Sequence, residues 1–522
     1  MTYMKKLLLS LLLVSGIALC AQTYPKNWHL NYSAKDTSLG IDLENAIKNN
    51  PVPANAKPVI VAVIDNGTDI KHLDLSRNIW INEKEIPGNS VDDDHNGYVD
   101  DINGWDYLGN AGEDIEYDNL EMTRLLRDYK KRFDGKTSKD IAKADQADFK
   151  KYKKLEAEFN KELNEANNIF KYIVYLKKMN DALIEELDSE NISLKNLEAF
   201  KANKPNAQYG QSITVAECKK RSITPKAYFD EIMEAYKHYY ASVNYQLSLE
   251  FDPREKIGDD YLNNNDHNYG NNDVHGPEGE HGTHVAGIIG AVRDNNLSAQ
   301  GIAPMVKLMI LRVVPDGDER DKDVANAIRY AADNGAKVIN MSFGKAYSFN
   351  KKIVDDAIKY AESKDVLMIH AAGNDGQNND KANNYPNPRY EDGTVCKTWI
   401  EVGASDRDQT PADFSNYGKT TVNVFAPGVK IYSTFPDNKY KAIDGTSMAS
   451  PVVAGLAALI RAYYPNLTAI QVKQVIESSV DKPTRKVKKP GTKRKKTKYK
   501  KISTSAGIVN ADKALKAAAT IK

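Results

Sequence analysis

Short apolar segments alternate with helical patterns along most of the chain, and this alternation is the feature that most restricts the fold. Residues 59–64 read VIVAVI, a continuous β-branched run typical of a strand buried on both faces of a sheet. Similar segments lie at 307–313, 337–340, 366–371 and 399–402. The stretch 325–334 between two of them has helical spacing. Strands separated by helices predict an α/β fold with a parallel sheet.

Between residues 118 and 249 the pattern changes to that of long amphipathic helices. Apolar residues recur there at spacings of three and four among many Lys and Glu. They are Tyr152, Leu155, Phe159, Leu163, Ala166, Phe170, Ile173 and Leu176. A charged helical segment inside an α/β pattern predicts an insertion whose apolar stripe packs on itself or on the main domain. We place a long helical insertion at 108–259, the α/β domain at 58–107 and 260–519, and an N-terminal extension at 22–57.

The start of the chain predicts export. Lys5 and Lys6 precede an apolar run at 7–20 that is about 14 residues long, too short to span a bilayer and typical of a signal peptide. We place the signal peptide at 1–21 and expect an exported protein without a transmembrane segment. Cys20 offers an alternative, the lipid anchor of a bacterial lipoprotein.

Composition excludes several classes of protein. With 41% hydrophobic residues, 27% charged residues and a formal net charge of +1, the chain has the composition of a soluble globular protein. It has no long-range attraction to nucleic acid or anionic lipid. Three cysteines are too few for a disulfide scaffold, and whether Cys218 and Cys396 pair stays open.

One local segment departs from the even charge balance. Residues 482–501 contain 12 Lys or Arg among 20 residues, with Tyr499 as the single aromatic residue. A nucleic-acid site would interleave more aromatic residues with the charge. We therefore interpret the segment as a basic, solvated surface loop of the α/β domain and expect no nucleic-acid partner.

Three segments far apart in the sequence each present one reactive side chain. Asp65 follows the strand 59–64 directly, which places it at the carboxyl end of a parallel strand, where open α/β sheets build their sites. His281 opens the segment HGTHVAG, and Ser447 lies in DGTSMASP before a small, apolar helix start. A serine hydroxyl is a poor nucleophile unless an imidazole takes its proton, and that imidazole needs a carboxylate to fix its tautomer. The three residues predict nucleophilic catalysis.

Each assignment has an alternative. Asp69 and Asp74 also offer carboxylates, but neither follows the strand directly, and His284 lies near His281 on a similar helix face. The tetrahedral intermediate needs donors for its oxyanion, and Asn374 in HAAGNDG is the candidate, together with the backbone N–H of Ser447. Asn-Asp-Gly is also ordinary turn chemistry, so Asn374 has a purely structural alternative.

The motifs around these residues resemble those of the subtilisin-like serine peptidases. The matching segments, in the order of that family, are VIDNGTDIKHLDL, HGTHVAGIIG, NMSFG, AAGNDG and GTSMASPVVAG. The resemblance covers about 310 residues and implies a sheet of about seven parallel strands with helices on both faces. It implies a secreted endopeptidase in which Asp65 is the triad aspartate, His281 the general base, Ser447 the nucleophile and Asn374 the oxyanion donor.

The resemblance also implies where substrate lies. Ser342, Phe343 and Gly344 match the segment that pairs with an extended polypeptide as an added strand, and Ala371, Ala372 and Gly373 match the other wall of the primary specificity pocket. We expect polypeptide substrates and a monomeric protein.

The chain departs from the usual pattern of the family at four places. Asn66 replaces Ser or Thr, Lys345 replaces a glycine, and His370 replaces a small residue at the pocket wall. Asp65 and His281 lie 216 positions apart, far more than in typical relatives, because the insertion falls between them.

An acidic segment suggests a structural calcium ion. In DDDHNGYVDD the residues at alternate positions offer oxygen ligands around the tight turn at Gly97. They are Asp92, Asp94, Asn96, Tyr98 and Asp100. Position twelve is Asn103 rather than a bidentate Glu, so the loop is no ordinary EF-hand. The alternative is a solvated acidic loop. The Asn-rich run 263–272 is either another such loop or a source of further ligands.

The same fold also permits a second class of function, that of a binding protein. A binding or scaffold protein with this fold and no turnover would use the helical insertion as its interaction surface. The presence of all three triad residues and of Asn374 favours the enzyme, because loss of catalysis usually replaces one of them.

Overall fold

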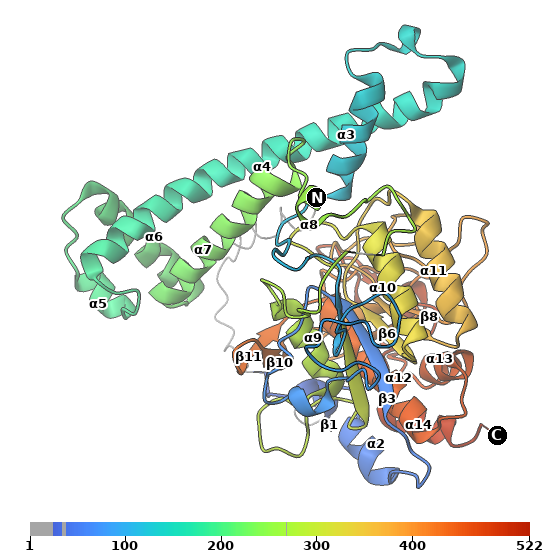
Figure 1. Ribbon diagram of the computed structural model, residues 1–522. Helices are drawn as coiled ribbons and strands as arrows, with labels where there is room; N and C mark the ends of the chain where they lie inside the picture. The colour runs from blue at the N-terminus through green and yellow to red at the C-terminus, as the bar shows by residue number, and fades with distance from the viewer. Residues whose placement is uncertain (1–23, 34–37, 268, 522) are drawn as a thin grey trace. The chain divides into compact units, whose positions relative to one another are not determined.

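The computed structural model describes residues 24–33, 38–267 and 269–521, and the chain divides into two compact units (Figure 1). The α/β unit comprises Thr23–Glu116 and Pro253–Lys522, and the helical unit comprises Tyr117–Asp252. The predicted signal peptide and Cys20 lie outside the described residues.

The α/β unit contains one large sheet, several short strand pairs and two layers of helices. Its strands are β1 (Tyr32–Ser33), β2 (Ser38–Leu39), β3 (Val59–Asp65), β4 (Gly104–Asp106), β5 (Val306–Arg312), β6 (Val338–Met341), β7 (Leu367–Ala371), β8 (Trp399–Ser405), β9 (Val424–Pro427), β10 (Ile431–Phe435), β11 (Lys439–Ile443), β12 (Val487–Lys488) and β13 (Lys496–Thr497). Its α-helices are α2 (Leu43–Asn49), α8 (Arg254–Ile257), α9 (Glu280–Gly290), α10 (Asp321–Asp333), α11 (Lys351–Ser363), α12 (Thr446–Tyr463), α13 (Ala469–Ser478) and α14 (Ala511–Ala518).

Seven strands form the central sheet in the order β4-β5-β3-β6-β7-β8-β9, and every neighbouring pair is parallel. Parallel strands need crossover connections, and the helices supply them on both faces. This confirms the predicted α/β fold with its three layers.

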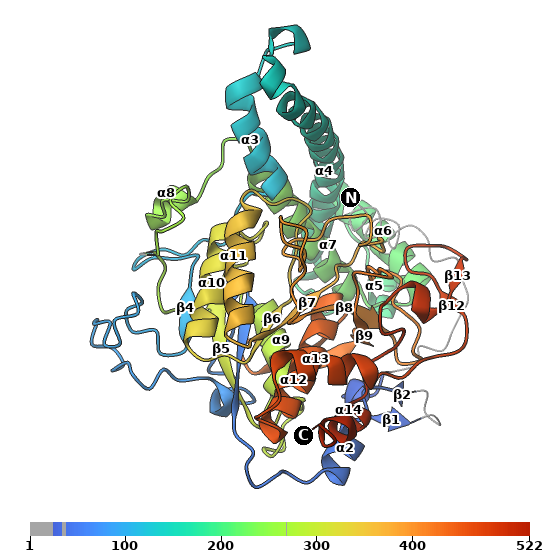
Figure 2. The same cartoon turned by 90° about the vertical axis from the view of Figure 1, so that its right-hand side faces the viewer.

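Strand β3 shows why the sheet is buried on both faces. Val59, Val61 and Val63 belong to the hydrophobic core beneath α9 and α12, whereas Ala62 and Ile64 belong to the core beneath α10 and α11 (Figure 2). Successive side chains of a strand point to opposite faces, so a continuous apolar run fills both cores at once.

The helical unit is built on one long helix. Its elements are α3 (Glu121–Phe133), α4 (Gln146–Leu187), α5 (Leu194–Ala199), α6 (Pro205–Arg221), α7 (Pro225–Ala241) and the π-helical turn Ser242–Gln246. Helix α4 has 42 residues, and α6 and α7 pack along it (Figure 1). Six of the eight stripe residues predicted from the sequence are buried, and Leu163 and Phe170 are half-buried. Gly210 allows α6 to approach closely, because a Cβ there would lie 2.4 Å from the carbonyl oxygen of Met179.

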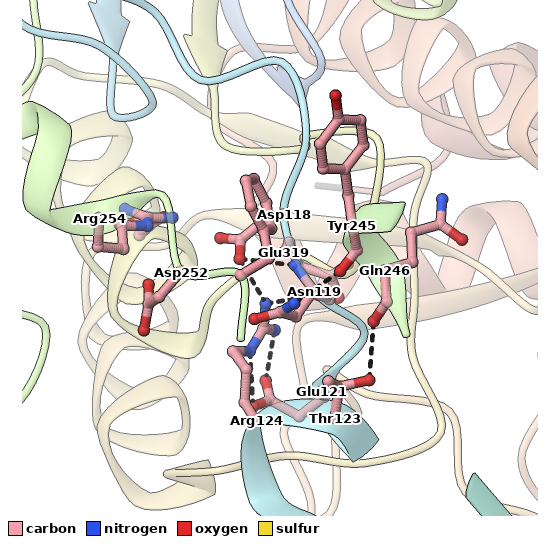
Figure 3. Close-up of polar contacts among 12 residues, drawn as sticks. Asp118, Asn119, Glu121, Thr123, Arg124, Tyr245, Gln246, Asp252, Arg254 and Glu319 are labelled. Atoms are coloured by element: carbon pink, nitrogen blue, oxygen red, sulfur yellow. Dashed lines mark hydrogen bonds and ion pairs between the residues drawn. The ribbon is translucent and has the colours of Figure 1, made fainter. Parts of the chain in front are cut away.

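The two ends of the helical unit are joined by polar contacts (Figure 3). Asn119 donates from its side chain to the carbonyl of Tyr245 (2.7 Å), and the Thr123 hydroxyl donates to the carbonyl of Gln246 (2.7 Å). Buried Arg124 pairs with Glu121 at 2.9 Å and donates to the Asn119 carbonyl at 2.7 Å. The chain therefore enters and leaves this unit at one place, as an inserted segment requires.

Cys218 and Cys396 are both buried free thiols, the first in the helical unit and the second in the α/β unit. Within the described part of the chain, no helix is long and apolar enough to cross a membrane.

Candidate active site

The carboxyl ends of three neighbouring strands bring the predicted site residues to one edge of the sheet. Strand β3 ends at Asp65, β6 ends just before Ser342, and β7 ends at Ala371. Ile64 pairs with Met341, and Met341 pairs with His370, so the three strand ends lie in register. A ligand site at this edge is the usual position in a parallel α/β sheet.

Asp65 and His281 form a direct pair. The buried Asp65 carboxylate lies with its Oδ1 2.6 Å from Nδ1 of His281, and the same oxygen accepts the backbone N–H of Asn66 at 2.9 Å. A carboxylate at Nδ1 holds the ring in the tautomer that leaves Nε2 unprotonated. Nε2 of His281 is therefore the atom available to take a proton.

The start of helix α9 packs closely against the loop that follows β3. A Cβ at Gly282 would lie 2.0 Å from the carbonyl oxygen of Gly67, so only glycine permits this approach. Asn66 accepts the Gly282 N–H at 2.8 Å and donates from its amide to the Glu278 carbonyl. Asn66, one of the departures from the family pattern, thus ties the strand that carries Asp65 to the helix that carries His281.

The surroundings shift the pKa of His281 upward. Burial of part of the imidazole lowers its pKa, but the adjacent Asp65 charge and hydrogen bond outweigh this, and the pKa lies above the ordinary 6.5. The side chain remains 37% exposed.

The alternative residues lie in other environments. His284 is fully buried, its Nε2 lies 3.0 Å from the Lys441 carbonyl, and burial lowers its pKa to about 3, as suits a packed neutral histidine. Asp69 accepts backbone N–H groups of Lys71 and Asp437, and buried Asp74 bonds to Tyr440 and Asn295.

Ser447 is the second residue of α12, and its surroundings fix where that helix begins. Its hydroxyl donates to the Ser342 carbonyl at 2.9 Å, and its own carbonyl accepts the Ser342 hydroxyl at 2.9 Å. The side-chain amide of Asn340 donates to the Ser342 hydroxyl at 3.0 Å, and its oxygen accepts the Ser450 hydroxyl at 2.8 Å. This ladder of polar groups joins β6 to α12, and among the described residues the Ser447 hydroxyl bonds to Ser342 rather than to His281.

Asn374 lies beside the start of the same helix. Its Oδ1 accepts both the backbone N–H and the hydroxyl of Thr446, each at 2.9 Å. Its amide nitrogen makes no hydrogen bond within the described part of the chain, so its two N–H groups remain available as donors next to Ser447.

The first predicted substrate wall, Ser342–Gly344, follows β6, and the second, Ala371–Gly373, begins at the last residue of β7. Asn384 contacts both walls. A Cβ at Gly344 would meet Oδ1 of Asn384 at 2.5 Å, and Nδ2 of Asn384 donates to the Ala371 carbonyl at 3.1 Å. Asn384 was not predicted, because no motif marks it. Its only local signal is the Asn-rich run before Tyr385-Pro386.

His370 lies behind the second wall and is not exposed to the cleft. It is completely buried, and its Nδ1 lies 2.9 Å from Glu401, which also accepts the indole N–H of Trp399 at 3.0 Å. The substitution of a small residue by His370 therefore changes the support of the wall rather than its surface.

A cleft of about 300 Å³ opens beside His281. Besides Asp65 and His281, it is lined by Asn66, Glu116, Glu278, Arg312, Val314, Pro315, Asp316, Ser342 and Phe343. The buried Arg312 pairs with Asp106 at 2.7 Å, so its charge is already compensated, and the cleft is rich in carboxylates.

Two side chains of the predicted calcium loop form hydrogen bonds with other groups of the protein. Asp100 is buried, and its two oxygens accept the N–H groups of Gly88 and Ser90, both at 2.8 Å. Tyr98 is buried, and its hydroxyl accepts from Tyr107 at 3.2 Å. These two side chains are thus engaged away from any common centre.

Three carboxylates of this region do converge. One oxygen each of Glu85, Asp92 and Asp94 lie within 4.8 Å of one another, and the Asp94 side chain is only 4% exposed. Among the described residues, the one cation within 4 Å of the three is the exposed Lys84, at 3.6 Å from Asp94. Asn96 Oδ1 accepts the Tyr98 N–H at 2.8 Å, and Glu85 and Asp92 likewise accept backbone N–H groups of this loop. Glu85 was not predicted, because it lies seven residues before the loop.

Comparison with known proteins identifies the family of the chain. The family model described as "Subtilase family" matches residues 56–507. The chain is 42% identical over 203 residues to a "Thermophilic serine proteinase" of Bacillus sp. (strain AK1), 38% identical over 200 residues to "Subtilisin DY" of Bacillus licheniformis, and 40% identical over 202 residues to a "Cell wall-associated protease" of Bacillus subtilis (strain 168).

The matched segments cover 39%, 38% and 38% of this chain and 47%, 69% and 21% of those relatives. The first relative is thus matched over about half of its own length. The family match spans most of the chain and both halves of its α/β unit. The chain therefore belongs to the Subtilase family, the subtilisin-like serine-type endopeptidases.

Proposed function

We propose that this chain is an exported endopeptidase that hydrolyses peptide bonds through an acyl-enzyme on Ser447. The observation that carries the proposal is the Asp65–His281 pair at 2.6 Å, held at the sheet edge where the Ser447 helix begins. In this scheme the Ser447 hydroxyl turns from the Ser342 carbonyl toward Nε2 of His281 and gives up its proton there.

The bonds change in two stages. The Ser447 oxygen bonds to the substrate carbonyl carbon, and the C–N bond then breaks as the leaving amine takes the proton from His281. Water next gives a proton to His281 as its oxygen bonds to the acyl carbon. The ester bond to Ser447 then breaks, the new carboxyl end leaves, and His281 returns the proton to the Ser447 oxygen. Asp65 stabilises the imidazolium in both stages and keeps its own charge.

Asn374 and the Ser447 backbone N–H are proposed to bind the oxyanion. Two features support this role: the amide nitrogen of Asn374 is available, and Ser447 lies in the first turn of α12, where the helix dipole favours negative charge. The walls Ser342–Gly344 and Ala371–Gly373 would hold an extended polypeptide by backbone hydrogen bonds, which supply affinity without requiring one sequence.

A fluorophosphonate probe and casein test the proposal directly. We expect one covalent label per chain, located at Ser447 by peptide mass mapping, together with release of peptides from casein. A chain that is folded yet neither labelled nor active would support the scaffold alternative instead.

Replacing Asn374 by Ala is expected to lower kcat about 10² to 10³-fold with little change in KM, the loss that removal of one such donor causes in subtilisin. The physical reason is that the donor acts on charge that exists only in the transition state. Steady-state kinetics on a fluorogenic peptide would measure it.

Asn374→Asp is the matched variant for this prediction, because it keeps an oxygen for Thr446 while it replaces the donor by a negatively charged acceptor. It should lose at least as much activity as Asn374→Ala. Recovery of activity in Asn374→Asp would show that Asn374 serves only to hold Thr446.

We further propose that Glu85, Asp92 and Asp94 hold a calcium ion, a type of ion that subtilases generally bind. Hard oxygen donors suit Ca²⁺, and three converging carboxylates with one exposed cation nearby favour a divalent ion because it relieves their mutual repulsion. The ion would supply structural stability to the segment that precedes β4, not chemistry at Ser447.

Removal of calcium by EDTA is therefore expected to lower the Tm, and about 2.7 kcal/mol of stability should return when free calcium reaches a hundred times its Kd. Asp94→Asn should remove most of this response, whereas Glu83→Gln, a change at an exposed neighbouring residue, should leave it intact. A Tm that ignores both EDTA and calcium would contradict the site.

Export is supported by the basic and apolar start of the chain and by the similarity to a "Cell wall-associated protease". Mass spectrometry of the protein recovered from outside the cytoplasm would show cleavage after residue 21 or a lipid on Cys20.

A further inference from the structure

The basic segment 482–501 is a folded hairpin attached to the α/β unit. Strands β12 and β13 pair antiparallel, with Val487 opposite Thr497 and Lys488 opposite Lys496 (Figure 2). Val487 is 2% and Tyr499 1% exposed, so apolar residues anchor this segment. The prediction of a solvated loop is therefore corrected to an anchored hairpin with exposed cations.

The anchor reaches the wall next to Asn374. Val487 and Tyr499 share one buried cluster with Ala372, and the Tyr499 hydroxyl donates to the Gln409 carbonyl at 2.9 Å. The hairpin turn touches the chain two residues after Asn374, because a Cβ at Gly491 would lie 2.2 Å from the Gly376 carbonyl oxygen. The cations of the hairpin are therefore held at a fixed position beside the proposed oxyanion residue.

Most of these cations are not neutralised. Eleven of the 12 basic residues at 482–501 are exposed, Lys489 is half-buried, and no acidic residue lies between them. Arg485 pairs with Asp408 and Lys488 with Asp413. Among the described residues, the other ten form no ion pair with a carboxylate within 4 Å.

Charge differs between the two sides of the site. The cleft beside His281 is lined by Glu116, Glu278 and Asp316, whereas the hairpin beside Asn374 is basic. A polypeptide crossing the site thus meets negative charge on one side and positive charge on the other, which favours one orientation of a charged substrate.

We propose that the hairpin, residues 485–498, is an exosite that binds an acidic stretch of the polypeptide substrate close to the scissile bond. The inference rests on the proposed peptidase function and adds a substrate class to it. A polypeptide fits better than nucleic acid, because the single aromatic residue of the segment, Tyr499, is buried and offers no stacking surface. It also fits better than a lipid surface, because the exposed residues of the hairpin include no large apolar side chain that would enter the headgroup region.

The test uses internally quenched peptides that share one cleavable core and carry four Glu or four Gln on either the N-terminal or the C-terminal side. We expect one of the two Glu placements to raise kcat/KM about tenfold over its Gln twin, through KM, and the gain to vanish between ~20 and ~300 mM salt. A gain from neither placement would overturn the proposal, and so would an equal gain from both.

The variant K493Q/R494Q/K495Q/K496Q should lose this gain and cleave the Gln peptides as the unchanged chain does. The control K48Q/K57Q/K352Q/K397Q removes four exposed lysines elsewhere on the same unit and should keep the gain. If the hairpin variant keeps the gain, or if the control loses it, the hairpin is not the exosite.

Binding separates this inference from the proposed function. Fluorescence anisotropy on the Ser447→Ala chain should show tighter binding of the favoured Glu peptide than of its Gln twin, whether or not the chain cleaves peptides. If the unchanged chain cleaves no peptide but still binds the Glu peptide more tightly than its Gln twin, only the peptidase proposal is contradicted. Preference for single-stranded DNA or anionic vesicles, with none for the Glu peptide, would overturn the exosite.

Discussion

Peptide hydrolysis should fall about 10⁶-fold when Ser447 is replaced by Ala, the size of loss that removing the nucleophile causes in subtilisin. The hydroxyl is the atom that bonds to substrate in the proposed scheme, and no other hydroxyl is placed beside both His281 and Asn374 by that scheme. Labelling by a fluorophosphonate should disappear together with activity. Burst kinetics on an ester substrate would show the acyl-enzyme in the unchanged chain and its absence in the variant.

Two further variants make this result specific. His281→Ala should cost about as much as Ser447→Ala, and the double variant little more, because the two groups act as one unit. Ser450→Ala, the same substitution in the next turn of α12, removes the hydroxyl that donates to Oδ1 of buried Asn340. It should cost about 1 to 3 kcal/mol of stability while labelling persists. Retained labelling in Ser447→Ala would place the nucleophile elsewhere.

The sheet and its edge could be predicted because their signals are local. The run 59–64 is apolar at every position, which only a strand buried on both faces requires, and Asp65 follows it without a linker. The segment HGTHVAG marked His281, and Ser447 was marked by the small, apolar helix start after it. The observed strand bounds differ from the predicted ones by a few residues at most, as at β8, which runs to Ser405.

Other parts of the site could not be predicted because they depend on the fold of irregular loops and on contacts between distant segments. Asn384 reaches the substrate walls from 40 residues beyond Gly344, and Glu85 joins Asp92 and Asp94 through the fold of its loop. The hairpin at 485–498 is fixed by Ala372 and Gly376, which lie more than 100 positions earlier. No spacing rule connects such pairs, since only the tertiary fold brings them together.

Replacing Asp65 by Asn is expected to lower kcat about 10⁴-fold, the loss that this change causes in a serine-protease triad. Oδ1 of Asp65 accepts from both His281 and the Asn66 N–H, while Oδ2 is buried and has no hydrogen-bond partner within the described part of the chain. An asparagine that keeps its oxygen in place buries an unpaired NH₂ group where Oδ2 was, at a cost of about 1 to 3 kcal/mol. If it rotates instead, the NH₂ faces Nδ1 and holds His281 in the tautomer whose Nε2 already carries a proton.

The pH profile distinguishes this effect from simple loss of structure. Neutral His281 is the active form, and its pKa lies above 6.5 because Asp65 outweighs burial, so kcat/KM of the unchanged chain should rise with pH and reach half its maximum above pH 6.5. In Asp65→Asn the stabilising charge is gone while the burial remains, so the residual activity should reach half its maximum at a lower pH than in the unchanged chain. Asp69→Asn, at the half-buried carboxylate four residues later, should leave both the rate and the midpoint as they are. An acid limb that stays in place in Asp65→Asn would mean that Asp65 does not set the protonation of His281, and the pairing seen at 2.6 Å would then have no part in the chemistry.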